Sequence, residues 1–121
     1  MNEVNSVRHA NFFILRKQNK KLSYIKLAKK ELDSWFFVDH NKVYKNYIAA
    51  GNAFTSEQDW QSAGKAYTYA GDDAYRMGRN MDACFAYLKA IDVLKKAPKI
   101  GNNEQIIERL SFIANKLYSG Q

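Results

Sequence analysis

Few residues in this sequence have the type and spacing that catalysis requires. Gly64-Lys65 is similar to the end of a phosphate-binding loop, but the upstream glycine of such a loop is absent and the lysine is followed by alanine. Cys84 falls among apolar residues at helical spacing, without a basic or histidine neighbour, so we expect a buried structural thiol. His40 follows Asp39, but no nucleophile is indicated, so we expect a solvated or capping histidine. We therefore predict no enzymatic activity and no cofactor.

A metal site is not expected either. One cysteine and two histidines, His9 and His40, cannot supply a four-ligand zinc site. The acidic residues Asp72, Asp73 and Asp82 lie on or near predicted helix ends, where surface solvation is the usual role.

Three consecutive large aromatic residues, Trp35-Phe36-Phe37, are the most unusual feature of the chain. Successive residues of a helix point about 100° apart, so the three rings cannot all face one core. One or two rings could still pack beneath a neighbouring pair of helices. The functional interpretation is an exposed hydrophobic tip, which on a soluble protein marks a contact surface.

Positive charge is concentrated close to this tip. Residues 1–30 contain eight lysines and arginines and one acidic residue, whereas residues 31–121 contain eleven of each sign. Lys26, Lys29 and Lys30 lie within about three helical turns of the aromatic residues. A basic segment suits an anionic membrane surface, a nucleic acid or a mitochondrial presequence, and it can also simply keep a protein soluble. No nucleic-acid-reading motif accompanies it, and it is poor in serine and arginine, so we favour the membrane surface.

The pattern of apolar residues predicts an all-α protein. One proline and six glycines in 121 residues argue against a turn-rich β fold, and the longest apolar run is far short of the roughly 20 residues of a membrane span. Apolar spacings of three and four predict helices over about 41–55, 60–78, 81–96 and 104–118, after a looser helical stripe over 4–34. Asp39 or Asn41 can cap the first of these four, and the segment 97–103, with Pro98, must end the third.

Small and aromatic residues alternate along two of these helices in the manner of a tetratricopeptide repeat. Tyr47, Ala50, Gly51 and Phe54 fit its first helix, and Ala63, Tyr67 and Ala70 fit its second. Small residues allow two helix backbones to cross closely while the aromatic rings fill the space beside the crossing. The spacing therefore predicts stacked antiparallel helical hairpins that form a short solenoid. The residues we expect to pack the repeats are Tyr47, Gly51, Phe54, Trp60, Ala63, Gly64 and Tyr67.

Two stretches carry a resemblance to a known family. The stretch 49–54, Ala-Ala-Gly-Asn-Ala-Phe, and the stretch 59–67, Asp-Trp-Gln-Ser-Ala-Gly-Lys-Ala-Tyr, resemble the early repeats of the soluble NSF attachment proteins, the SNAP adaptors of vesicle fusion. The similarity continues through 82–84 and 89–97, and upstream Lys26-Leu27-Ala28-Lys29-Lys30 and the aromatic residues 35–37 resemble the family's first helix and its aromatic loop. About residues 22–97 are covered.

The resemblance implies a membrane-docking role for the aromatic loop and contact of the concave face with SNARE bundles. Activation of the NSF ATPase is not expected, because the chain is less than half the family's usual length and the end 116–121 lacks an acidic-leucine terminus. The implied membrane-binding residues are Trp35, Phe36, Phe37, Lys26, Lys29 and Lys30. We expect residues 1–21 to be a basic extension or helix and residues 22–121 to form the helical domain.

These observations predict a noncatalytic, SNAP-like adaptor in vesicle trafficking, soluble, cytoplasmic and peripheral on anionic membranes, with a SNARE or another trafficking protein as its partner. The alternative is a tetratricopeptide-like module that binds a peptide or protein without membrane contact; a nucleic-acid-binding protein is disfavoured. The last predicted helix is rich in apolar residues, so we expect it to double back as a cap or to mediate self-association. Its apolar residues are Ile106, Ile107, Leu110, Phe112, Ile113 and Leu117.

Overall fold

A computed structural model describes residues 20–32, 39–99 and 101–120, and it confirms that these parts of the chain are helical. A helix over residues 20–32 is followed by α2 (His40–Ser56), α3 (Trp60–Arg76), α4 (Asn80–Lys96) and α5 (Asn103–Tyr118). The bounds of α2 to α5 differ by at most two residues from those predicted. Of the two predicted caps, Asp39 is the one observed, since its side chain accepts from the backbone N–H of Lys42 at 3.3 Å.

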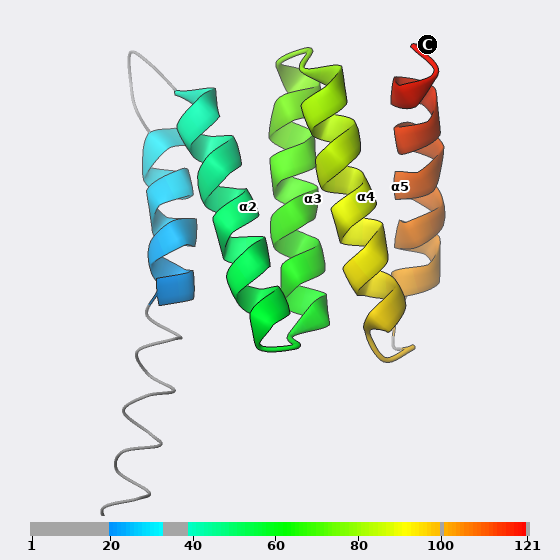
Figure 1. Cartoon of the computed structure of the whole chain (residues 1–121), viewed down its shortest axis with the longest axis horizontal. Helices are drawn as coiled ribbons and strands as arrows, with labels where there is room; N and C mark the ends of the chain where they lie inside the picture. The colour runs from blue at the N-terminus through cyan, green and yellow to red at the C-terminus, as the bar shows by residue number, and fades with distance from the viewer. Residues whose placement is uncertain (1–19, 33–38, 100, 121) are drawn as a thin grey trace, which may run out of the picture.

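The helices lie in a row in chain order, and each runs opposite to the one before it (Figure 1). Contacts between helices are concentrated between successive ones: α2 packs on α3, α3 on α4, and α4 on α5. Two edges result. One edge holds the start of α2, the α3–α4 turn and the end of α5, and the other holds the α2–α3 turn and the α4–α5 loop. We call these the first edge and the second edge.

The chain repeats itself from one helix to the next across α2, α3 and α4. Each of these helices is 17 residues long, and they begin at the evenly spaced positions His40, Trp60 and Asn80. The inward-facing positions recur with the same step, as in Tyr47, Tyr67 and Tyr87 and in Ala50, Ala70 and Ala90, all of which are buried. The two-helix tetratricopeptide pattern does not describe this period of one helix. The period becomes visible when the sequence is aligned with itself so that His40 matches Trp60.

The two turns within this repeat have equivalent hydrogen bonds. In the α2–α3 turn, the backbone N–H groups of Glu57 and Asp59 both donate to Phe54 O. In the α3–α4 turn, those of Met77 and Arg79 both donate to Ala74 O, at the equivalent positions of the next repeat. The residue after each helix cap has a positive φ, 61° at Gln58 and 72° at Gly78. Glycine adopts this left-handed conformation without steric cost, whereas glutamine does not.

A glycine and a tyrosine meet at each of the first two helix crossings. The ring of Tyr67 packs directly on Gly51, and the ring of Tyr87 packs on Gly71, so that a Cβ at either glycine would overlap the ring. The tyrosine hydroxyls are fixed as well, because each donates at 2.6 Å to a side chain of the preceding helix, Asn52 or Asp72. Gly64 has a similar role against Leu94. These glycines therefore set how closely neighbouring helices approach.

The remaining repeat-packing residues lie in or beside the core. Ala63 is fully buried, while Phe54 and Trp60 are partly buried and pack against the same cluster. Cys84 is buried, as expected, with its thiol 3.7 Å from the carbonyl oxygen of Ala114.

Helix α5 packs its apolar side on α4. Leu110 and Leu117 are buried, and Ile106, Ile107 and Ile113 pack partly buried against the core. The outward side carries one large apolar residue before the last turn, Phe112, and the Lys116 ammonium lies 4.6 Å from the centre of its ring. The other outward positions are polar, which is typical of a helix that ends a stack.

Candidate functional site

The predicted aromatic tip, Trp35-Phe36-Phe37, lies outside the described residues, but the helix over 20–32 before it and Asp39 after it are described. The backbone N–H of Asp39 donates to the Glu31 carboxylate at 2.8 Å. This bond ties the start of α2 to the end of the helix over 20–32, so residues 32 and 39 both lie at the first edge (Figure 1).

The three predicted membrane-binding lysines, Lys26, Lys29 and Lys30, are all exposed on the helix over 20–32. Leu22 and Leu27 of the same helix are about half exposed, at 51% and 48%. The inward side of this helix is different, because Ala28 is fully buried. The outward side therefore combines positive charge with accessible apolar surface, and we call it the cationic face.

Lys21 directly precedes residue 22, where the helical domain is predicted to begin. It lies within the first described helix, is 4% exposed, and forms an ion pair with Glu57 at the end of α2. Its ammonium also lies 5.0 Å from the centre of the Phe54 ring. Residues 20 and 21 therefore belong to the helical body, and the ion pair holds the first described helix against α2. The local sequence does not indicate this role of Lys21, because Lys21 lies in a run of basic residues and its partner, Glu57, is 36 residues away.

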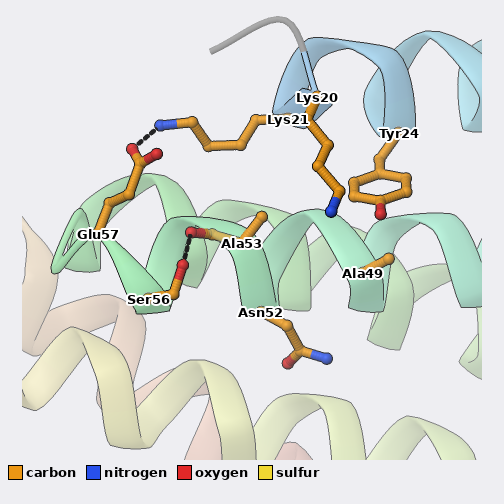
Figure 2. A pocket seen from close by; sticks show the side chains of 8 residues that line it. All are labelled: Lys20, Lys21, Tyr24, Ala49, Asn52, Ala53, Ser56 and Glu57. Atoms are coloured by element: carbon orange, nitrogen blue, oxygen red, sulfur yellow. Dashed lines mark hydrogen bonds and ion pairs between the residues drawn. The ribbon is translucent and has the colours of Figure 1, made fainter. Parts of the chain in front are cut away.

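A pocket of about 450 Å³ lies between this helix and α2 (Figure 2). Lys20 and Tyr24 extend towards α2 from one side, and the Lys21–Glu57 pair closes one end. Ala49 and Ala53 line the α2 side, where their small side chains leave the space. Lys20 has no acidic partner among the described residues, so the pocket offers a cation and a phenol to an anionic or carbonyl group.

His40 and Asp73 correct two expectations from the sequence. His40, expected to be solvated or to cap a helix, is instead the first residue of α2, and its Nδ1 lies 2.7 Å from Oδ1 of Asp73. Asp73 is 2% exposed rather than solvated, and its Oδ2 has no hydrogen-bond partner in the described parts of the chain. The expectation failed because Asp73 occupies the position of the repeat that is equivalent to Val93 of α4, which is also buried.

The His40–Asp73 pair links α2 to α3 at the first edge. The pKa of Tyr47 is raised above its ordinary value of 10.0. Burial is the largest cause, and the nearby Tyr69 and the Asp73 carboxylate add to it. Tyr47 and Tyr69 have ring centroids 5.5 Å apart. These contacts form a structural cluster between α2 and α3.

Asp82 lies near the start of α4, as expected, and takes part in the link between α2 and α4. Its carboxylate pairs with Arg79 at 2.5 Å, and its backbone carbonyl accepts from the Tyr44 hydroxyl at 3.2 Å. The Arg79 guanidinium lies 5.4 Å from the centre of the Tyr44 ring. The α3–α4 turn is thereby held against the first turns of α2.

Two classes of site are not found in the described residues. No three side chains among their histidines, cysteines, aspartates and glutamates are grouped so that they could hold a metal ion. Within these same ranges, no helix is both long enough and apolar enough to cross a bilayer.

Comparisons with known proteins identify no relative. No family model matches the chain, and no curated protein or solved structure is significantly similar to it. The functional argument therefore depends on the residues and their arrangement.

Proposed function

We propose that this chain is a noncatalytic, SNAP-like adaptor of vesicle trafficking that docks on anionic membranes from the cytoplasmic side. The observation that carries this proposal is the cationic face of the helix over 20–32. Exposed Lys26, Lys29 and Lys30 share this helix with half-exposed Leu22 and Leu27, a combination suited to the interface of an anionic bilayer. Residues 35–37 follow this helix in sequence and supply aromatic side chains for insertion.

We propose a tetratricopeptide-like solenoid as the scaffold of this adaptor. Its support is the antiparallel order of the helices and the repeated packing of Tyr67 on Gly51 and of Tyr87 on Gly71. The polar outer side of α5 suits a cap, so we assign α5 that role rather than self-association.

A protein partner, a SNARE helix in this proposal, is assigned to the exposed side of α4. Phe85 and Leu88 are each 53% exposed, and the Lys89 ammonium lies 5.3 Å from the centres of both the Phe85 and Tyr67 rings. Apolar groups beside a cation suit a helix that carries both apolar and acidic residues. This surface equally supports the second candidate function, a peptide-binding module without membrane contact.

Flotation with liposomes separates the two candidates. We expect the full chain to float with phosphatidylcholine vesicles that contain phosphatidylserine, and the triple variant Trp35→Ser, Phe36→Ser, Phe37→Ser to remain with the free protein. The melting temperature of the triple variant should stay within a few degrees of the wild type, because the proposal places these rings outside the core. A large loss of stability would identify the rings as core residues.

A pull-down from detergent-solubilised membranes tests the partner. Retention of SNAREs by the wild type, and loss of that retention with Phe85→Ser and Leu88→Ser, is the expected result. SNARE retention without any flotation would favour the binding module.

A further inference from the structure

We infer that the α3–α4 turn is a second membrane contact, in which Met77 and Met81 enter the bilayer interface beside the start of α2. This inference depends on the proposed membrane docking and extends it to residues outside the stretches that carry the resemblance. Met77 is 48% exposed and Met81 is 68% exposed. Both lie at the first edge, where the helix over 20–32 ends and α2 begins (Figure 1).

The repeat shows that these methionines are not required by the fold. The α2–α3 turn has the same hydrogen bonds and the same backbone conformation, with Glu57 and Gln61 at the positions of Met77 and Met81. Gln61 bonds to the side chain of Asn103, and Glu57 to that of Lys21, so both have polar partners at the second edge. One backbone turn therefore carries polar residues at one edge and exposed apolar residues at the other.

The surroundings of the methionines suit an anionic bilayer. Arg76 precedes Met77 and is exposed, and Lys42 is exposed in the first turn of α2. Arginine and lysine beside apolar side chains place cations at the level of lipid headgroups while the apolar groups reach deeper. Tyr75 and Tyr118, 54% and 78% exposed, lie in the last turns of α3 and α5 at the same edge and have the amphipathic ring that this depth favours.

The position of the turn is fixed relative to α2. Arg79 lies over the Tyr44 ring and pairs with Asp82, whose carbonyl accepts from the Tyr44 hydroxyl. A turn held in this way keeps a fixed orientation relative to the start of α2, so the two contact the membrane together. Two contacts on one rigid body bind a surface together more strongly than either does alone.

Flotation of paired variants tests the inference. Met77→Ser with Met81→Ser should lower partitioning onto phosphatidylserine-containing vesicles about tenfold, because each methionine loses part of the transfer free energy of a buried side chain. The matched control is Phe112→Ser. Phe112 is also an exposed apolar side chain, but it lies in the middle of α5, away from the first edge, and has no role in the proposed binding surfaces. We expect the control to partition like the wild type.

A fluorescent probe gives an independent readout. An environment-sensitive dye on Met81→Cys should shift to the blue on addition of the same vesicles and be quenched by nitroxide-labelled lipid, whereas the dye on Phe112→Cys should do neither. Unmodified chain treated with the dye measures any background from Cys84, which is 3% exposed.

The outcomes distinguish the inference from the function on which it depends. Wild-type flotation that requires residues 35–37 but is unchanged by the methionine pair, or a dye at position 81 that stays in water, overturns the inference and leaves the proposed docking intact. A dye at position 112 that also enters lipid shows contact through the side of α5 and overturns the inference. A wild-type chain that does not float overturns both.

Discussion

Gly71 and the ring of Tyr87 lie so close that a Cβ on the glycine would be 2.6 Å from two ring carbons. The ring cannot easily swing away, because its hydroxyl donates to Asp72 at 2.6 Å. The same relationship holds one repeat earlier between Gly51 and Tyr67, whose hydroxyl donates to Asn52. The repeat is thus a unit of packing, in which each glycine allows one helix to approach the tyrosine of the next.

The first prediction follows from this packing. Gly51→Leu should lower the free energy of unfolding by about 1–3 kcal/mol, because the new side chain must displace Tyr67 in a close-packed interior. Urea denaturation measures the loss, and Lys45→Leu, an exposed position of the same helix, is the matched control. A melting transition of Gly51→Leu equal to that of the wild type would show that the crossing is not close.

The second prediction concerns the unusual backbone of Gln58. Gln58→Gly should raise the free energy of unfolding by about 1 kcal/mol, because the left-handed conformation at φ 61° is unfavourable for a residue with a Cβ. Gly78→Ala at the equivalent position of the next turn should lower it by a similar amount. Thermal melting of both variants checks the pair, and changes of the same sign would contradict the explanation.

The third prediction concerns the buried acid of α3. His40→Ala should lower the free energy of unfolding by about 3 kcal/mol, because the Asp73 carboxylate would lose its partner while remaining buried. The double variant His40→Ala with Asp73→Ala should recover part of this loss, since no unpaired acid then remains. A double-mutant cycle in urea gives the coupling energy. Additive losses would mean that the two side chains do not interact in solution.

The helices were predictable from the sequence because their ends have local causes. Asp39 caps α2 through its own side chain, and Pro98 cannot continue α4. The pairing of helices was harder to predict, because it depends on small residues whose partners lie on the next helix. Tyr67 and Tyr87 both fit the apolar pattern of their helices. That their hydroxyl groups bond to equivalent positions of the preceding helix, Asn52 and Asp72, is recognised only together with the single-helix period.

The candidate site was only partly predictable, for reasons of distance along the chain. Exposed lysines on a basic helix were expected, and Lys26, Lys29 and Lys30 are exposed. Local sequence does not show that Lys21 is buried against Glu57, or that Asp73 is buried beside His40, because these partners are 36 and 33 residues apart. Charged residues are usually solvated, and only the contacts of the folded chain identify the exceptions.

The last prediction tests whether the cationic face contacts the membrane. Replacing Lys26, Lys29 and Lys30 with glutamine should weaken binding to phosphatidylserine-containing vesicles by up to about 1 kcal/mol for each lysine. The difference from the wild type should shrink at high salt, because surface charges are screened, while the contribution of apolar side chains persists.

The matched control replaces Lys65, Lys95 and Lys99 with glutamine. All three are exposed, they lie in the halves of their helices nearer the second edge or in its loop, and their removal changes the net charge by the same amount. Equal weakening by the two triple variants would show that only net charge matters. If neither variant weakens binding, the cationic face lies away from the bilayer and docking depends on apolar side chains alone.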